Sequence, residues 1–329
     1  MQLNKKKILI TGSSGYIGSC LKKFLENKFK VYGIDKNELV FKEKNFFKTN
    51  ILSINKLEKI IENIKPDIII HLAAQSTIDN IKKKNSYIKN NIKATNILLR
   101  IVKKKKIKYF LFASTAAVYK SSKKKLSEKS QTKPNNIYGK TKHKCEINIR
   151  KKLNNNLHKF LIFRFFNVCS ALKQFKIGEM HEPETHLIPI IVNKFLNKKK
   201  IILYSNNKSE TNIRDYVHIY DLCNAIYKGI IYLLNKKKSY VFNIGSINNY
   251  HSTWKIINYF NKYFAKNKLK YTFSKKRLGD EEKLICSIKK IKKILKWKPI
   301  NSKLSIIFRD ELVWQKYLRG RKIINRTIY

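Results

Sequence analysis

Two hydrophobic patterns alternate along the first half of the chain. Runs in which every residue is apolar, such as Ile8, Leu9 and Ile10, are typical of strands buried on both faces of a sheet. Between such runs apolar residues recur every three or four positions, as at Ile17 and Leu21, which predicts amphipathic helices. Later strands are predicted at residues 30–34, 45–48, 67–72, 109–113 and 160–165, and helices at 54–64, about 85–102 and about 136–153. This alternation predicts a parallel sheet covered on both faces.

Three glycines follow the first apolar run. Gly12, Gly15 and Gly18 have the spacing of a strand-to-helix turn whose bare backbone admits the pyrophosphate of a dinucleotide. The second strand is followed by Asp35, whose carboxylate suits the two hydroxyls of an adenosine ribose and repels a 2′-phosphate. The pattern predicts NAD in preference to NADP. Such glycines also occur in ordinary loops, and the alternative for Asp35, which stands beside Lys36, is that it starts a turn.

These features predict an α/β fold, with a Rossmann-type doubly wound parallel sheet and a smaller mixed α/β lobe on its C-terminal side. The alternation of strands and helices weakens after Asn167. We expect an NAD-binding domain over residues 1–167, to which about 213–247 return, and a substrate lobe over about 168–212 and 248–329. Ligands of open α/β sheets bind beyond the carboxyl ends of the strands. One crevice is therefore expected beside the residues that follow strand ends: Thr11, Asp35, Ala73, Thr115 and Asn167.

A tyrosine and a lysine four residues apart are the candidate catalytic pair. Tyr138 and Lys142 share one face of the helix predicted at about 136–153, about 6 Å apart along its axis. Tyrosine is a poor base at its ordinary pKa of about 10, but the Lys142 ammonium and the positive ring of oxidised nicotinamide would lower that pKa. The phenolate could then take a proton from a hydroxyl that Thr115 orients, while the hydride leaves for NAD. An ordinary helix pair with a snorkelling lysine is the alternative.

The charge of the chain is large but scattered. Its 329 residues include 73 Lys and Arg against 21 Asp and Glu, a net charge of +52 that is typical of proteins binding nucleic acid or acidic membranes. The lysines lie in short runs throughout the sequence, such as 103–106 and 198–200, which favours solvated surfaces over a polyanion footprint. A polyanion-binding protein that keeps the fold without turnover is the rival interpretation, supported by the basic, aromatic tail 317–329.

The cysteines predict a reducing compartment, and the hydropathy predicts a protein without membrane spans. Five cysteines without paired spacing indicate free thiols and argue against a disulfide framework or a zinc site. No apolar run approaches the length of a membrane span, and the Lys-rich start is followed by a glycine turn rather than a signal-peptide core. We expect a cytoplasmic protein that binds neither nucleic acid nor membrane and holds no metal.

The later chain adds more specific motifs to the glycine loop, Thr115 and the Tyr138–Lys142 pair. They are Arg164-Phe-Phe-Asn167, Pro183-Glu-Thr-His-Leu-Ile-Pro189, Ile213-Arg-Asp-Tyr-Val-His218, Phe242-Asn-Ile-Gly245 and Arg277-Leu-Gly-Asp280. With these motifs in this order along nearly its full length, the chain resembles the UDP-glucose 4-epimerase family of extended short-chain dehydrogenases/reductases. The run from Pro183 to Pro189 is the most specific motif and the glycine loop the least.

The resemblance implies NAD as the cofactor and a UDP-sugar as the substrate. The residues implied to bind NAD are Gly12, Gly15, Tyr16, Ile17, Gly18, Asp35, Asn50, Ile51, Leu72, Ala73, Ala74, Asn91, Tyr138 and Lys142. Those implied to bind substrate are Thr115, Asn167, Leu187, Tyr204, Arg214, Arg277, Asp280 and Leu284. Arg214 and Arg277 would grip the diphosphate, since a guanidinium fork matches phosphate oxygens, and Tyr204 would stack on uracil. Surface charge and a core aromatic are the alternatives for these residues.

The implied reaction is epimerisation at C4 of a UDP-hexose, most simply the interconversion of UDP-glucose and UDP-galactose. Tyr138 would remove the C4 hydroxyl proton, and a transient 4-keto sugar would turn over and take the same hydride back on its other face. Asn50, Ser76 and Phe165 depart from the family pattern, and the segment before Arg214 is shorter. UDP-N-acetylhexosamine and UDP-glucuronate therefore stay open as substrates.

Two further expectations follow from the resemblance. Nucleotide-sugar 4,6-dehydratases carry Asp-Glu directly after the threonine, where this chain has Ala116 and Ala117, and methyl groups cannot shuttle the protons of a dehydration. The resemblance also implies a homodimer formed by the helices near Asn91 and Tyr138.

Overall fold

The structure, a computed structural model, describes residues 2–38, 45–76, 84–122, 124–181, 183–209, 211–236, 238–275 and 281–321. The chain forms two compact units. Unit 1 holds Met1–Lys120, Gln131–Phe165 and Ile226–Phe242, and unit 2 holds Ser121–Ser130, Phe166–Ala225 and Asn243–Tyr329. None of the helices in the described ranges is both long and apolar enough to cross a bilayer.

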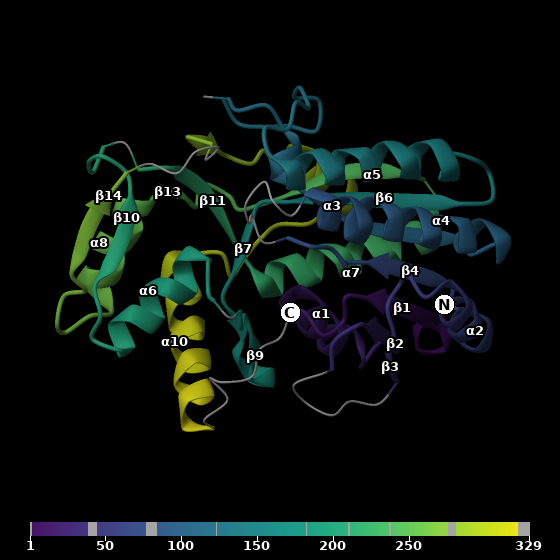
Figure 1. The fold of residues 1–329 in the computed structure, drawn as a ribbon, viewed down its shortest axis with the longest axis horizontal. Coiled ribbons are helices and arrows are strands. Elements are labelled where there is room, and N and C mark those ends of the chain that lie inside the picture. Colours follow the sequence, from purple (N-terminus) through teal and green to yellow (C-terminus); the bar gives the residue numbers. More distant parts are fainter. Residues whose placement is uncertain are drawn as a thin grey trace. The chain divides into compact units, whose positions relative to one another are not determined.

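Unit 1 is built on a seven-stranded sheet with the order β12-β6-β5-β4-β1-β2-β3 (Figure 1). The strands are β1 (Lys7–Thr11), β2 (Lys30–Asp35), β3 (Phe46–Lys48), β4 (Ile68–His71), β5 (Tyr109–Thr115), β6 (Lys159–Phe165) and β12 (Tyr240–Ile244). Neighbouring strands from β3 to β6 pair in parallel. The strand order reverses between β1 and β4, so the sheet is doubly wound and the predicted fold class is confirmed.

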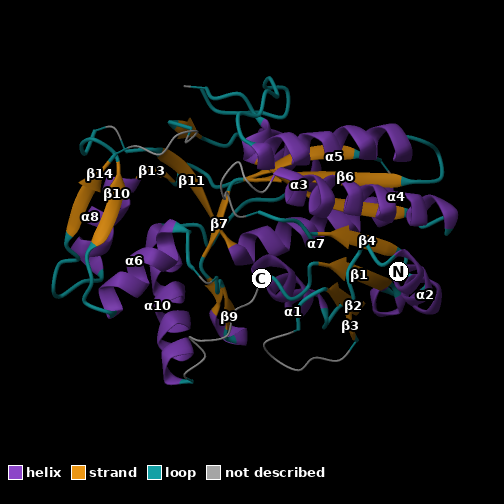
Figure 2. Ribbon diagram, in the orientation of Figure 1, coloured by secondary structure: helices purple, strands orange, loops and turns teal. Residues whose placement is uncertain are grey.

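Helices lie against both faces of this sheet (Figure 2). On one face, α2 (Ile54–Ile64), α4 (Ala94–Lys104) and α5 (Ile137–Leu153) share a buried core with strand residues such as Leu9 and Phe110. The other face is covered by α1 (Tyr16–Leu25) and α7 (Ile219–Lys236): Gly33 of β2 faces Lys22 of α1, and Gly229 of α7 faces Phe163 of β6.

One predicted helix differs from the structure. The segment predicted as a single helix over about 85–102 consists of α3 (Lys84–Tyr87), a π-helical turn (Ile88–Lys93) and α4. A π turn widens a helix locally and is frequent at functional sites. Here it holds Asn91, whose buried amide bonds the loop after β4 and α5, so tertiary hydrogen bonding explains the departure from regular α-helix.

Unit 2 is a mixed α/β lobe. Its strands are β7 (Asn167–Cys169), β8 (Ala171–Leu172), β9 (Ile177–Gly178), β10 (Ile201–Tyr204), β11 (Ile213–His218), β13 (Tyr250–Ser252), β14 (Tyr271–Ser274) and β15 (Lys283–Leu284). Its helices are α6 (Leu187–Leu196), α8 (Thr253–Tyr263), α9 (Lys289–Leu295) and α10 (Leu304–Gly320). Strand β11 pairs in parallel with β7 and β15 and antiparallel with β13, and β10 pairs with β14. Helices α6, α8 and α10 bury a second core against these strands.

Candidate active site

The glycine turn after β1 leaves an open cradle at the start of α1. Gly12 has a φ of +77°, which an L side chain rarely adopts. A Cβ on Gly18 would collide with the Gly12 carbonyl oxygen, so the turn and the helix touch through bare backbone. A Cβ on Gly15 would meet only that oxygen, at 3.5 Å. Gly15 is the N-cap of α1, and no described side chain caps this helix, which leaves its N-terminus suited to an anion.

Asp35 lies against this turn at the end of β2. Its carboxylate oxygens accept hydrogen bonds from the backbone N–H of Ser14, at 3.1 Å, and of Asn37, at 3.0 Å. Burial raises the pKa of Asp35, while these backbone donors oppose the shift. The Ser13 hydroxyl in the same turn is buried without a hydrogen-bond partner among the described residues. A glycine cradle, an uncapped helix end and a nearby carboxylate fit the pyrophosphate and ribose of a dinucleotide.

The remaining predicted cofactor residues surround the ends of neighbouring strands. Leu72, Ala73 and Ala74 follow β4, and the Ala73 backbone lies where a side chain on Gly12 would be. Ile51 is buried, while Asn50 is exposed and accepts a hydrogen bond from the Leu52 N–H. Tyr16 and Ile17 open α1.

Asn91 has a supporting place in this region. Its side chain accepts from the Gln75 N–H at 2.8 Å and donates to Thr141 Oγ1 at 2.9 Å. The amide therefore links the loop after β4 to helix α5.

Local contacts bring Thr115 and Tyr138 together. Helix α5 begins at Ile137 because Asn136 caps it, accepting from the Gly139 N–H at 2.8 Å. A Cβ on Gly139 would collide with the carbonyl oxygen of Ala117, so glycine lets the helix start lie directly on the turn that follows Thr115. The Thr115 side chain lies close enough to Tyr138 to lower the pKa of the phenol.

The electrostatics of this pair differ from the prediction. Loss of hydration raises the pKa of Tyr138 to about 12, although Thr115 opposes the shift, whereas the sequence predicted a lowered value. Burial lowers the pKa of Lys142 to about 8, and its ammonium lies 4.2 Å from the centre of the Phe112 ring. The predicted lowering required two cations beside Tyr138, of which the chain itself supplies only lysine.

A buried network that joins α5 to the sheet was not predicted. Glu146 of α5 accepts from Arg164 Nε at 2.9 Å and Nη2 at 2.6 Å, and from the Ser114 hydroxyl at 2.6 Å. The Arg164 guanidinium also lies 4.7 Å from the Tyr119 ring centre. The arginine holds the pKa of Glu146 below its usual range despite burial. The sequence signal was Arg164 inside an otherwise apolar strand, since a buried charge requires a partner.

Thr115 lies in unit 1, and the other predicted substrate residues that the structure describes lie in unit 2, on several elements. Arg214 of β11 is the register partner of Leu284 on β15. Two residues further along β11, Tyr216 pairs with Asn167 on β7. Leu187 begins α6, and Tyr204 ends β10 with 40% of its surface exposed. Arg277 and Asp280 lie outside the described residues.

Asp215 fixes the strand that carries Arg214. It is buried and accepts from the backbone N–H of Ser246 at 2.6 Å and of Cys286 at 3.2 Å. Burial raises its pKa to about 7. The acid that follows Arg214 in the sequence therefore binds backbone amides.

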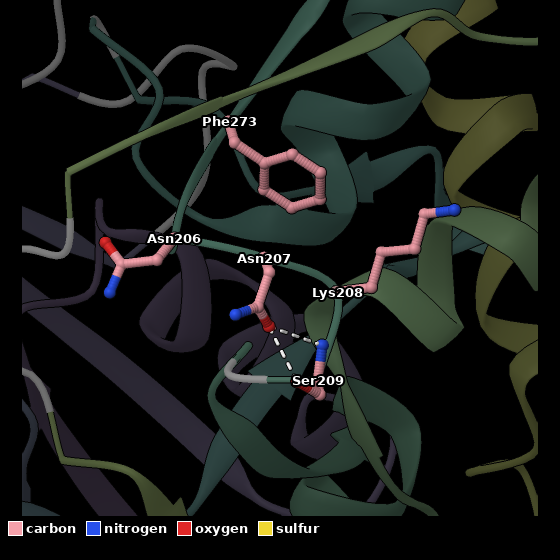
Figure 3. Close-up of a pocket in the computed structure, with 5 residues that line it drawn as sticks. All are labelled: Asn206, Asn207, Lys208, Ser209 and Phe273. Carbon is pink, nitrogen blue, oxygen red and sulfur yellow. Dashed lines mark hydrogen bonds between the residues drawn. The ribbon is translucent and has the colours of Figure 1, made fainter.

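A shallow pocket of about 450 Å³ lies in unit 2 just after Tyr204 (Figure 3). It is lined by Asn206, Asn207, Lys208, Ser209 and Phe273. The Asn207 amide oxygen accepts from the backbone and hydroxyl of Ser209, which shapes the loop around the Phe273 ring. The pocket therefore combines two amides, a hydroxyl and a lysine with one aromatic ring, that of Phe273.

Comparison with known proteins defines the family. The sequence profile of the NAD dependent epimerase/dehydratase family matches residues 8–245, which hold the glycine turn, the Thr115–Tyr138 pair and Arg214. The chain belongs to the NAD dependent epimerase/dehydratase family. Within this family, the UDP-glucose 4-epimerase of Lactobacillus helveticus is 30% identical over 94% of this chain and 97% of its own length.

Two other family relationships bear on the reaction. A solved UDP-glucose 4-epimerase superposes with a TM-score of 0.86 at 28% identity, covering 96% of this chain and 99% of that one. The dTDP-D-glucose 4,6-dehydratase of Dictyostelium discoideum is 35% identical over 77% of this chain and 62% of its own length. The epimerase relationship therefore extends over nearly the whole chain, and the dehydratase relationship over a smaller part.

Proposed function

We propose that this protein interconverts UDP-hexoses that differ in configuration at C4, with UDP-glucose and UDP-galactose as its substrates and NAD as a resident cofactor. The observation that carries the proposal is the close contact at Gly139, which lays the start of α5, with Tyr138 and buried Lys142, directly on the turn that follows Thr115. Full-length relatedness to UDP-glucose 4-epimerases supports the sugar and the nucleotide.

The cofactor would lie on unit 1, which we assign as the NAD-binding domain. The turn at Gly12, Gly15 and Gly18 and the N-terminus of α1 would hold the pyrophosphate, and Asp35 would bind the adenosine ribose. When bound, NAD supplies reversible hydride transfer at C4 of the sugar. Asp35 would also disfavour a 2′-phosphate.

Tyr138 would take the proton from the C4 hydroxyl and later return it, while Thr115 orients that hydroxyl. The raised pKa of Tyr138 keeps the phenol protonated in the free protein. Positive charge brought by the cofactor, together with Lys142, would be needed to favour the phenolate at neutral pH. Ala116 and Ala117 occupy the turn after Thr115 and offer no proton donor, which favours epimerisation over dehydration.

Unit 2 would hold the UDP portion of the substrate. Arg214, with Arg277, would bind the diphosphate bidentately, and Asp280 the uridine ribose. Asn167 and the Leu187 backbone would meet the uridine, and Tyr204 would stack on uracil. Leu284, the register partner of Arg214, would limit the size of the sugar.

The test is incubation of the tag-free purified protein with UDP-galactose and no added NAD, followed by NMR of the anomeric protons. Conversion to a mixture with UDP-glucose is expected. Tyr138→Phe should retain bound NAD and lose at least about 100-fold in turnover, whereas Tyr227→Phe, on α7, should leave turnover unchanged. Unchanged UDP-galactose in a protein that contains NAD would reject this sugar, and UDP-N-acetylgalactosamine and UDP-glucuronate would be tried next. A 4-keto-6-deoxy product would indicate dehydration instead.

We also propose a cytoplasmic homodimer. Helix α5 exposes 44% of Ile147 and the π-helical turn exposes 40% of Ile88, apolar surface that a partner would cover. Light scattering should give twice the chain mass, and Ile147→Lys should yield monomers that keep their NAD. A monomeric native protein would reject the dimer.

A further inference from the structure

The segment between β9 and α6 gathers four side chains that can ligate a metal. Glu179, His181, Glu184 and His186 each offer one oxygen or nitrogen atom, and these four atoms all lie within 4.8 Å of one another. We call these residues the His-Glu cluster. Two imidazoles and two carboxylates form a donor set that suits zinc and similar divalent ions.

The geometry within the cluster converges on Glu179. His181 Nδ1 lies 3.1 Å from Glu179 Oε1 and 3.8 Å from Glu184 Oε1, and His186 Nδ1 contacts the same Glu179 oxygen. The two imidazole rings are perpendicular, with centres 5.4 Å apart. Both Nδ1 atoms therefore face one small volume beside the carboxylates.

The carboxylate on which the cluster converges is buried and only partly satisfied. Glu179 is fully buried, and its Oε2 has no hydrogen-bond partner among the described residues. His181 Nδ1 is also buried without a hydrogen bond that meets normal geometry. Nearby Glu311 of α10 is buried, interacts electrostatically with Glu179 and Glu184, and likewise leaves its Oε2 unpartnered. Buried carboxylates require a cation or hydrogen-bond donors. Among the described residues, hydrogen-bond donors satisfy only some of the carboxylate oxygens of Glu179 and Glu311.

Hydrogen bonds to neighbouring residues hold the cluster in place without a metal. The Glu179 carbonyl accepts from the Trp314 indole at 2.7 Å, which anchors the segment on α10. The Glu184 carboxylate accepts from the backbone N–H of Thr185 and of His186, both at 2.8 Å, immediately before α6 begins at Leu187. The ligating atoms are thus fixed at both ends of the segment, as a preformed site requires.

We propose that the His-Glu cluster binds one divalent transition-metal ion, for which Zn²⁺ is the natural probe, and that this ion fixes the segment leading into α6. The role is structural, because all four positions are filled by protein and no open coordination site is left for water or substrate. The proposal does not depend on the proposed function, since its readout is metal content and ligand type.

The test uses the full chain, tag-free, stripped with a chelator and dialysed against Zn²⁺ or Co²⁺. We expect one Zn²⁺ per chain by mass spectrometry. The Co²⁺ form should show visible ligand-field bands without a thiolate charge-transfer band, because the five cysteines are not ligands. His181→Gln and His186→Gln should each weaken Zn²⁺ binding at least about 10-fold, while His143→Gln in unit 1 should not.

A second measurement guards against misfolding of the variants. Zn²⁺ should raise the melting temperature of the native protein, because it binds only the folded chain, and should leave that of His181→Gln unchanged. In chelator, the two proteins should melt at similar temperatures. Substoichiometric zinc, a thiolate band, or equal zinc affinity in native protein and both cluster variants would overturn the proposal and leave the cluster as an ion-pair network.

Discussion

Lys142 illustrates how a proposed catalytic residue can oppose folding. Its ammonium is buried beside Phe112, and burial lowers its pKa from 10.5 to about 8. The unfolded chain therefore binds this proton more tightly than the folded one, so stability rises as pH increases from about 8 to 10.5. Below pH 8 the full cost of burying the charge is present.

Replacing Lys142 with methionine should therefore stabilise the protein while disabling it. At pH 7, Lys142→Met is expected to raise the free energy of unfolding by about 1–3 kcal/mol, and the gain should shrink as pH rises toward 10.5. Turnover should fall sharply because the charge beside Tyr138 is lost. Denaturant unfolding at pH 7 and pH 10 measures the first effect. The control is Lys140→Met, on the same helix but exposed, which should change neither quantity. A destabilised Lys142→Met variant would contradict the argument.

At the scale of single elements, substitutions in the turn between β1 and α1 can distinguish the glycine that the fold needs from the one that NAD binding needs. Gly18→Ala would place a methyl group on the Gly12 carbonyl, whereas Gly15→Ala would place one in ordinary contact, at 3.5 Å. Gly18→Ala should lower both stability and NAD content. Gly15→Ala should melt within about 2 °C of the native protein yet bind NAD at least about 10-fold more weakly, because the methyl group would occupy the pyrophosphate space. Melting curves and NAD released on denaturation measure the two effects. If Gly15→Ala keeps full NAD affinity, the pyrophosphate lies elsewhere.

The ion pair of Glu146 and Arg164 links helix α5 to strand β6 of the sheet. Glu146→Gln would leave the Arg164 charge buried and unpaired, which should lower the free energy of unfolding by about 3–5 kcal/mol. The double variant Glu146→Gln with Arg164→Met removes both charges and should recover much of that loss. Urea unfolding of the single and double variants tests the coupling. Equal losses in both would show that the pair contributes little beyond packing.

The elements that patterning predicted well are those whose hydrophobic period is unambiguous. Helix α2 occupies the predicted residues because its apolar positions recur at helical spacing. The central strands match to within about two residues because each is a mostly apolar run bounded by polar residues. The π-helical turn at Ile88–Lys93 was missed because it depends on hydrogen bonds from Asn91 to Gln75 and Thr141, distant in sequence. Periodicity carries no signal for such long-range bonds.

The parts of the candidate site that could be predicted are those whose residues lie close together in the sequence. The Tyr138–Lys142 spacing and the glycine turn are readable from one helix and one loop. The raised pKa of Tyr138 was not, because it follows from the packing around its hydroxyl. The residues of the His-Glu cluster stand close together in the sequence, between Glu179 and His186, but their spacing matches no common metal-ligand motif, and only the fold brings their ligating atoms within 4.8 Å of one another.

For the molecule as a whole, the net charge of +52 should weaken the fold and attract the substrate. Raising NaCl from about 0.05 to 0.5 M shortens the screening length from over ~10 Å to under ~5 Å, so self-repulsion falls and the melting temperature should rise. The same salt should raise KM for the dianionic UDP-sugar by screening its attraction, with kcat nearly constant. The salt effect on melting should weaken near pH 10.5, where lysines lose charge.

This salt series also separates the enzyme from the polyanion-binding rival. A protein that neutralises many phosphates at once loses affinity as a steep power of salt concentration, whereas a UDP-sugar offers only two phosphates and should show a shallow dependence. We expect co-purified nucleic acid to be released by 0.5 M NaCl with NAD content and kcat unchanged. Loss of NAD together with the nucleic acid, or tight oligonucleotide binding that survives high salt, would favour the rival, because a fold kept only as a basic scaffold has no need of a retained cofactor.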